Sequence, residues 1–394
     1  MTSEQLRLVA RPSGAGELFQ LLRDGRPRTR ADLAQITGQA RSTIAARVDL
    51  LLASGFVAPA GEASSTGGRP PATFAFNPAA RIVLAVDLGA THVSLAVTDL
   101  AQNVLAELTE PLAIARGPEH VLDRVADLGA DLVTGAGRAM TDLVSVGVGL
   151  PGPVAHSSGR PIDPPIMPGW DDADVPGYLG GLLGAAVLVD NDVNLMALGE
   201  HRSEWPEIDH LFFIKVATGI GAGIISDGRI RRGAQGAAGD VGHIAVPGGR
   251  DVPCHCGNVG CLEAIASGQA VADALRATGA DTATSADVVA LVRAGDVAAS
   301  HAVREAGRDI GRVLATCVSL LNPSVIVVGG IVAEAGEHLL AGIREVVYSR
   351  SLPLATEHLR IVTARTKGRA GVLGASSMAA EHVLSTAAMD ALLG

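Results

Sequence analysis

Apolar positions in the first 80 residues recur at the spacing of short helices. The pattern predicts a first helix around 18–22, a second that begins after Thr29, and a third that ends near Gly55. Two strands are expected to follow the third helix, at 56–58 and 73–76, with a turn-rich connection between them. This part of the chain therefore reads as a small helical domain that ends in a hairpin.

A short helix, a tight turn and a longer helix form a helix-turn-helix, whose second helix lies in the major groove of DNA. The two strands would add a wing, so we expect residues 1–80 to be a winged helix-turn-helix domain. The alternative is a three-helix bundle with a solvated polar face, which the wing disfavours. The predicted DNA-binding residues are Arg41, Ser42, Thr43 and Arg47 on the third helix and Arg69 in the wing.

Two glycine-rich turns follow apolar strands in the rest of the chain. The strand 82–86 runs into Asp87-Leu88-Gly89-Ala90-Thr91, and the strand 212–216 runs into Thr218-Gly219-Ile220-Gly221-Ala222-Gly223. Glycine lets a backbone approach a phosphate closely. One such turn is more often a plain hairpin, but the pair predicts the duplicated fold of actin, heat-shock ATPases and sugar kinases.

The fold class expected from this duplication is α/β. The body would be an actin-like (ribonuclease H-like), two-lobed fold of the sugar-kinase type, joined to the N-terminal winged helix-turn-helix. The first lobe is expected over 81–198, completed by a C-terminal helix at 376–394, and the second lobe over 199–375.

Asp192 follows the apolar strand 186–189 and precedes a helix expected from about 195 to 201. A helix N-terminus favours an ionised carboxylate, which could accept a proton from a sugar hydroxyl. Helix capping is the common role of Asp at such a position. The two glycine-rich hairpins around it favour the chemical role.

One histidine and three cysteines lie within nineteen residues of each other. Four such ligands suit a closed tetrahedral zinc site, and the Cys-x-Cys spacing disfavours a disulfide between neighbours. Because a closed site has no vacant position for a substrate, the zinc is expected to be structural. His255 is the alternative to the histidine in the predicted ligand set, which is His243, Cys254, Cys256 and Cys261.

The net charge of −10 is unevenly distributed. The first 81 residues contain ten Arg against six Asp and Glu, a balance of +4, which leaves −14 for the remainder. An acidic body would repel phosphate, so DNA contact is expected at the basic end only. Since the sequence shows neither a long apolar run nor a signal peptide, a cytoplasmic location without membrane partners is expected.

Four motifs belong together: Gly239-Asp240-Val241-Gly242-His243, Cys254-x-Cys256-Gly257-x-x-Gly260-Cys261-Leu262-Glu263, Asp87-x-Gly89-x-Thr91 and Asn191-Asp192. They resemble the motifs of the ROK family of repressors and sugar kinases, and the added head is similar to its regulators. By this resemblance Asp192 is the catalytic base of a kinase member. The implied ligand-binding residues are Gly152, Asn191, Asp192, Asp240, His243 and Glu263. The implied nucleotide-binding residues are Asp87, Gly89, Thr91, Gly219, Gly221, Gly223, Gly329 and Gly330.

The chain departs from the family's pattern at three places. Ala90 and His92 stand where family kinases have Gly and Lys, so a cationic phosphate contact is missing. Asp240 replaces a Glu, and Ile166 replaces an Asn that touches the sugar in relatives. These departures argue against the use of ATP and Mg²⁺ and for a ligand other than the usual hexose.

The sequence therefore predicts a homodimeric transcriptional regulator, most often a repressor in this family, that binds operator DNA and a sugar or sugar derivative. Ligand binding would change operator affinity. Two alternatives stay open. One is an ATP-dependent sugar kinase with a DNA-binding head, and the other is a DNA-binding protein that needs no ligand.

Overall fold

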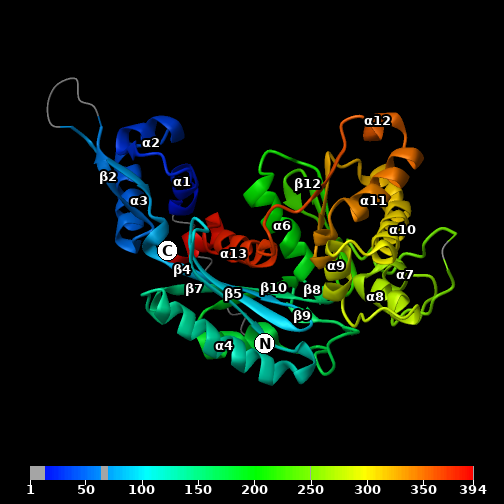
Figure 1. The fold of residues 1–394 in the computed structure, drawn as a ribbon. Helices are drawn as coiled ribbons and strands as arrows, with labels where there is room; N and C mark the ends of the chain where they lie inside the picture. The colour runs from blue at the N-terminus through cyan, green and yellow to red at the C-terminus, as the bar shows by residue number, and fades with distance from the viewer. Residues whose placement is uncertain (1–13, 64–69, 249, 394) are drawn as a thin grey trace, which may run out of the picture.

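A small N-terminal head is followed by two α/β lobes, and the last part of the chain returns from the second lobe to the head (Figure 1). The computed structural model describes residues 14–63, 70–248 and 250–393. None of the helices within these residues is long and apolar enough to cross a membrane.

The head contains three helices and one small sheet, as the apolar pattern predicts. They are α1 (Ala15–Leu22), β1 (Arg28–Thr29), α2 (Arg30–Thr37), α3 (Arg41–Ser54), β2 (Val57–Glu62) and β3 (Ala72–Phe76), with strand order β1-β3-β2. Thr29 and Asp32 form a capping box at the start of α2, each side chain accepting from the other's backbone N–H. Gly55 ends α3 in the left-handed conformation that glycine adopts without strain. The predicted winged helix-turn-helix is confirmed.

Two five-stranded sheets form the body. The first contains β4 (Ile82–Leu88), β5 (His92–Asp99), β6 (Val104–Pro111), β7 (Leu143–Leu150) and β10 (Ala186–Asn191). The second contains β11 (Leu211–Val216), β12 (Ile220–Ser226), β13 (Arg229–Ile230), β14 (Val325–Gly329) and β15 (Arg360–Thr363). The orders β10-β7-β4-β5-β6 and β15-β14-β11-β12-β13 are equivalent. In both, the first strand pairs antiparallel with the next and parallel with a later one, which confirms the duplicated, actin-like fold.

Helices cover the sheets and close their cores. They are α4 (Pro118–Gly135), α5 (Val175–Leu183), α7 (Leu262–Ala266), α8 (Gly268–Ala277), α9 (Ser285–Arg293), α10 (Val297–Leu321), α11 (Glu337–Arg350) and α12 (Pro353–Thr356). Strands β4 and β11 are buried along nearly their whole length, since both faces of each sheet are covered. A separate short hairpin joins β8 (Val154–Ala155) to β9 (Arg160–Pro161).

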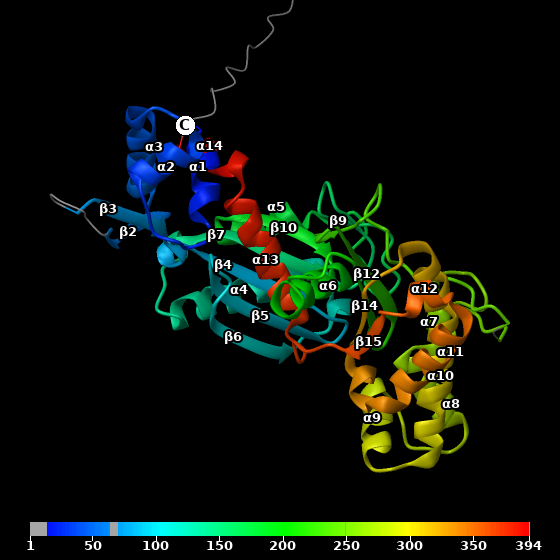
Figure 2. The ribbon, with the colours of Figure 1, turned by 90° about the horizontal axis from the view of Figure 1, so that it is seen from above.

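Helices α6 (Asp192–Glu204) and α13 (Ala370–Val383) pack against each other at the junction of the lobes (Figures 1 and 2). Their backbones approach closely because glycines face the contact. A Cβ atom at Gly199 would lie less than 3.0 Å from the carbonyl of Ala370, and one at Gly374 less than 3.0 Å from that of Leu195. The lobe boundaries expected after 198 and 375 fall inside these two helices, since α6 contributes to the cores of both lobes.

A buried carboxylate fixes the segment that leads from β15 into α13. Glu200 of α6 is fully buried and accepts hydrogen bonds from the Arg365 N–H (2.8 Å), the Thr366 N–H (3.1 Å) and the Thr366 hydroxyl (2.7 Å). The chain therefore crosses between the lobes at two places, through α6 and through this segment, and Glu200 ties the two crossings together.

The C-terminal helix expected over 376–394 is two helices in the structure, α13 and α14 (Thr386–Leu393). Helix α13 begins earlier than expected because its Gly, Ala and Ser residues show little apolar periodicity, and they are buried by close packing instead. Helix α14 then packs on α1 of the head (Figure 2). Phe19, Leu384 and Met389 belong to one apolar core, so the head and the end of the chain are packed as a unit.

Candidate ligand site, metal cluster and DNA-facing helix

The first turn of α6 is capped by Asn191. Its Oδ1 accepts from the backbone N–H groups of Val193 (2.9 Å) and Asn194 (3.2 Å), and its Nδ2 donates to the carbonyl of Gly152 at 2.9 Å. These bonds join two of the predicted ligand-binding residues, Gly152 and Asn191. They also show that Asn191 caps the helix, while Oδ1 of Asp192 accepts from the Val193 N–H as well, at 2.8 Å.

Lys215 projects from the apolar strand β11 and forms an ion pair with Asp192. Its Nζ lies 2.5 Å from Oδ2 of Asp192, and the two side chains are 24% and 5% exposed. Burial by itself would lower the pKa of Lys215, but attraction by Asp192, Asp87 and Glu263 raises it above its ordinary value. Lys215 therefore stays protonated at neutral pH and holds one carboxylate oxygen of the predicted catalytic base.

Asp87 lies beside this pair and beneath the start of α13. A Cβ atom at Gly149 would lie 3.4 Å from Oδ1 of Asp87 and 3.5 Å from Cα of Asp192, while one at Gly371 would overlap the Asp87 carboxylate. The pKa of Asp87 is raised to about 7, mainly by burial and then by the charge of Asp192, while Lys215 acts to lower it. The structure thus brings Asp87 and Asp192 together, as their motifs predict.

His92 occupies the end of the first glycine-rich turn. A Cβ atom at Gly89 would lie less than 3.0 Å from the His92 ring, so this glycine makes room for the histidine. Burial, followed by the charge of Lys215, lowers the pKa of His92 below its ordinary value. The ring is therefore neutral near pH 7 and does not replace the cation that is missing from the sequence.

A second charge pair links the lobes near Asn191. Asp190, at the end of β10, has a side chain only 3% exposed and accepts from Arg232 Nε at 2.6 Å. It also accepts from Asn194 Nδ2 (3.0 Å), and His156 Nδ1 lies 3.9 Å away. Because Arg232 comes from the second lobe, this pair fixes the strand end from which Asn191 and Asp192 emerge.

Glu263 extends from α7 to the second glycine-rich turn. Its Oε2 accepts from the Ile220 N–H at 2.9 Å, and a Cβ atom at Gly219 would collide with this carboxylate. Its own N–H donates to the carbonyl of Gly242 at 2.8 Å, next to His243. One oxygen of this predicted ligand-binding residue is therefore engaged within the protein.

The remaining candidate nucleotide-binding glycines have packing roles. A Cβ atom at Gly223 would lie less than 3.0 Å from Ala197 Cβ on α6, and one at Gly221 would lie 3.0 Å from the Val193 side chain. The Phe213 ring occupies the space beside Gly329, and Gly330 has a φ of 83°. Close packing on α6 thus explains Gly221 and Gly223, and close packing on β11 explains Gly329 and Gly330, without a nucleotide. Thr91 is exposed.

Two of the residues that depart from the family's pattern, Asp240 and Ile166, lie at the surface. Asp240 is exposed, and the preceding Gly239 carbonyl accepts from the N–H of Ala222 at 2.9 Å, which places it beside β12. Ile166 is 48% exposed, whereas the adjacent Met167 is buried, and its Sδ would lie 3.5 Å from a Cβ atom at Gly152. The segment that replaces the amide of relatives therefore adds apolar surface close to Gly152.

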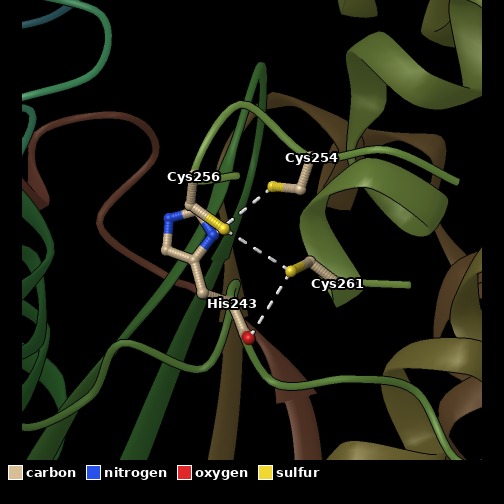
Figure 3. A group of neighbouring side chains, drawn as sticks. All are labelled: His243, Cys254, Cys256 and Cys261. Atoms are coloured by element: carbon tan, nitrogen blue, oxygen red, sulfur yellow. Dashed lines mark hydrogen bonds between the residues drawn. The ribbon is translucent and has the colours of Figure 1, made fainter. Parts of the chain in front are cut away.

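Four potential metal ligands converge in the second lobe (Figure 3). One ligand atom from each of His243, Cys254, Cys256 and Cys261 lies within 4.8 Å of all the others. Nδ1 of His243 is 3.6 Å from Cys254 Sγ, and the Sγ atoms of Cys256 and Cys261 are 3.7 Å apart. A tetrahedron with zinc–sulfur bonds of about 2.3 Å has edges of about 3.8 Å. The cluster could therefore hold a metal ion such as zinc, and the exposed His255 lies outside it.

The backbone around the cluster brings its side chains together. Cys261 pairs with Ala245 in an isolated β-bridge, and Cys254 N–H donates to the carbonyl of Asn258 at 2.8 Å. The Asn258 N–H lowers the pKa of Cys256 to about 7, whereas burial raises that of Cys261 to about 12. A metal ion would displace the Cys261 proton on binding.

The first turn of α3 presents Arg41, Ser42 and Thr43 to solvent, as predicted. Within the described residues of the head, Arg41 is the one arginine that makes no hydrogen bond or ion pair, whereas Arg23, for example, pairs with Glu381. The exposed first turn of α3 therefore offers an uncommitted guanidinium beside two hydroxyl groups.

Arg47 is less accessible than its predicted role requires. It is half-buried, donates to Gln39 Oε1 at 2.5 Å, and lies where a Cβ atom at Gly14 would be. Its guanidinium therefore contacts the turn before α3 and the start of α1. Arg69, predicted to act from the wing, lies outside the described residues.

Comparison with known protein families matches residues 83–382 to the ROK family. The chain belongs to the ROK family. This ROK protein is 28% identical over 382 residues to the xylose repressor of Caldicellulosiruptor bescii, covering 93% of this chain and 95% of that protein. It is 30% identical over 309 residues to a glucokinase of Halalkalibacterium halodurans, covering 75% of this chain and 93% of the glucokinase.

A solved ROK structure shares the whole architecture. It is that of a ROK family transcriptional regulator, a homolog of the Escherichia coli MLC protein, with 26% identity and a TM-score of 0.79. The match covers 97% of both chains, so it includes the head. The ROK family contains both repressors and sugar kinases, and this ROK protein shares its full extent with regulators.

Sequence reasoning missed Lys215. The signal was a single charged residue in the otherwise apolar strand 211–216, directly before a glycine-rich turn. A lysine in a buried strand is unfavourable unless a carboxylate pairs with it. The link between Arg232 and Asp190 was missed too, because no sequence pattern connects residues 42 positions apart.

Proposed function

We propose that this ROK protein is a sugar-responsive transcriptional repressor, which binds operator DNA as a homodimer. The observation that carries this proposal is the continuous packing that leads from Asp192 to the head. Helix α6 starts at Asp192 and packs on α13, and α14 then packs on α1. A shift of α6 on ligand binding would move α13 with it and change the position of the head.

Names of relatives that share the head support this proposal. They include xylose repressors and an N-acetylglucosamine repressor of Escherichia coli, the latter covering 95% of this chain. The exposed first turn of α3, with Arg41, Ser42 and Thr43, would contact the operator, and Arg69 would do so from the wing. Arg47 would hold the turn before α3. A two-fold dimer would require a pseudo-palindromic operator.

The sugar would lie at the junction of the lobes, with a structural zinc ion in the cysteine cluster. Asn191 and Asp192 would contact it from the first turn of α6, Gly152 from the neighbouring turn, and Asp240, His243 and Glu263 from the second lobe. Zinc would fix His243 and the loop that ends at Glu263. We expect no phosphoryl transfer, because Lys215 is paired with Asp192 and the neutral His92 supplies no cation.

The DNA-binding part is tested with an operator selected from a random duplex library. Arg41→Ala should weaken binding at least about tenfold at a fixed salt concentration, because a guanidinium contact to phosphate or base is lost. Arg350→Ala, which removes an exposed arginine of α11, is the matched control and should change affinity little. Equal effects of the two variants would contradict the assignment of α3.

Metal content tests the cysteine cluster. We expect about one zinc per chain in the purified protein, and a loss of that metal together with a lower melting temperature in Cys256→Ser. Cys317→Ser, a cysteine buried in α10 away from the cluster, should keep the metal. Full zinc content in Cys256→Ser would contradict the predicted ligand set.

The enzymatic alternative is tested by a coupled assay for ATP-dependent phosphorylation across a panel of sugars. No turnover is expected. Turnover that disappears in Asp192→Asn would establish a kinase activity and overturn this part of the proposal.

A further inference from the structure

Each basic side chain around Asp192 is either paired with a carboxylate or uncharged. Lys215 is paired with Asp192 at 2.5 Å, and Arg232 is paired with the buried Asp190 at 2.6 Å. The remaining basic side chains are His92, whose pKa is lowered by burial and by Lys215, and His156, whose pKa is lowered by burial and by Arg232, so both rings are neutral near pH 7. Within the described residues of this cluster, a negatively charged ligand would find no uncommitted positive charge.

Carboxylates outnumber cations in the same cluster. Three of them, Asp192, Asp87 and Glu263, act on Lys215 strongly enough to keep it protonated despite its burial. Asp240 adds an exposed carboxylate beside β12. Asp192 and Glu263 therefore more than balance the charge of Lys215, and Asp87, with a pKa of about 7, adds a partial negative charge at neutral pH.

Resting on the proposed sugar-sensing function, we propose that this site takes an uncharged sugar and rejects its phosphate ester, because Asp192 holds Lys215. A hydroxyl group can donate to Asp192 while the ion pair stays intact, since a carboxylate oxygen accepts more than one hydrogen bond. A phosphate would have to displace Asp192 from Lys215 and leave a carboxylate that is 5% exposed without its partner, which is costly.

Lys215 is thus a specificity-determining residue that acts through Asp192. The same pair separates this site from a phosphoryl-transfer site. A transferring phosphate needs a cation that is free to meet it, and the one cation in position here neutralises the carboxylate that would act as base.

The test compares two variants that each release a cation from its carboxylate. Asp192→Asn frees Lys215 in the site, whereas Glu110→Gln frees Arg124, which is paired with Glu110 at 2.8 Å outside the site. The probe is inorganic phosphate, titrated against the full chain at fixed ionic strength and followed by calorimetry, with circular dichroism to show that both variants are folded. We expect Asp192→Asn to bind phosphate at least about tenfold more tightly than wild type, the equivalent of one charge-assisted hydrogen bond. Glu110→Gln should change the affinity less than about threefold, because a partly exposed arginine binds phosphate weakly at this ionic strength.

A double variant assigns the gain to Lys215. Adding Lys215→Met to Asp192→Asn should return phosphate affinity to the wild-type level. The proposal is overturned if Asp192→Asn binds phosphate no more tightly than Glu110→Gln, or if the gain survives the loss of Lys215.

A second arm uses sugars and the wild-type chain. Xylose, glucose and N-acetylglucosamine are compared with their phosphate esters by thermal shift at equal concentration. A free sugar should raise the melting temperature and its ester should not, and the reverse order would overturn the proposal. If no compound shifts the melting temperature, the phosphate titration decides. Failure of the proposed function would show separately, as a bound ligand that leaves operator affinity unchanged.

Discussion

Helix α13 contacts the body and the head through different chemistry. Against α6 its backbone lies at close range, and Gly374 and Gly199 leave no space for a side chain. Near its C-terminal end it meets the head through a partly exposed ion pair between Arg23 and Glu381, and Gln20 Nε2 donates to the Leu384 carbonyl at 2.8 Å. The first contact is tight and apolar, whereas the second contains polar bonds that can be exchanged with water.

This difference indicates where the molecule can adjust. Closely packed backbones move as one body, so a change in α6 should be passed to α13 without loss. The polar bonds between α13 and the head can rearrange at a small cost in free energy, while the buried core that contains Phe19, Leu384 and Met389 keeps α1 and α14 together. We therefore expect substitutions at the first contact to affect stability, and substitutions at the second to affect the response of the head to ligand.

The largest effect is expected for Gly374→Ala. The added Cβ would overlap the Leu195 carbonyl, so α13 must move away from α6, at a cost of about 2 kcal/mol or more. Gly181→Ala is the matched control, because this glycine of α5 has no atom within 4 Å of the added Cβ. It should stabilise the chain by about 0.5 kcal/mol. Urea unfolding gives the stability of both variants, and equal unfolding midpoints for the two would refute the close contact between α6 and α13.

A different effect, on the way stability depends on pH, is expected from Asp87, beneath the start of α13. Its pKa is raised from 3.8 to about 7, so the folded state binds a proton that the unfolded state releases between these values. Stability should therefore fall as the pH rises from about 4 to about 7, by up to about 1.4 kcal/mol per unit, and should level off above pH 7.

Asp87→Asn should flatten this slope, since the amide does not titrate. Asp281→Asn, at an exposed position of the second lobe, serves as the control and should keep the slope of the wild type. Melting temperatures between pH 4 and pH 8 make the comparison. The same slope in Asp87→Asn and wild type would show that Asp87 is not the titrating group.

The smallest effect on stability is expected for Arg23→Ala, at the contact between α13 and the head. A partly exposed ion pair contributes less than about 1 kcal/mol. Arg124→Ala is a closely matched control, because Arg124 pairs with Glu110 at the same distance of 2.8 Å and with similar exposure. Both variants should lose little stability, but only Arg23→Ala should reduce the effect of ligand on operator affinity. An equal reduction in both would contradict a role for this contact.

The parts of the molecule that could be predicted from sequence are those with local signals. Thr29 and Asp32 predict the start of α2, and the two glycine-rich turns predict the duplicated fold of the body. The close spacing of Cys254, Cys256 and Cys261 predicts the metal cluster, because these potential ligands are near each other in the chain. The capping box and the metal cluster are formed by residues that are close in the chain, and the duplicated fold shows itself as a motif that occurs twice in the sequence.

The parts that could not be predicted depend on contacts between distant segments. Helix α13 is rich in Gly, Ala and Ser, and only its packing on α6 explains why these residues form a buried helix. Gly221 and Gly223 have the spacing of a phosphate turn but face α6. Lys215 of β11 meets Asp192 at the start of α6, and Arg47 points from α3 toward Gln39.

The most direct test of the central claim measures operator affinity of the wild-type chain with and without a sugar that binds it. The sugar is chosen by thermal shift, and the affinity is measured by fluorescence anisotropy at fixed salt concentration. We expect bound sugar to lower operator affinity at least about fivefold, the usual lower range of coupling between two sites. An unchanged operator affinity at a sugar concentration that saturates the protein by calorimetry would contradict the claim that this ROK protein is a sugar-responsive repressor.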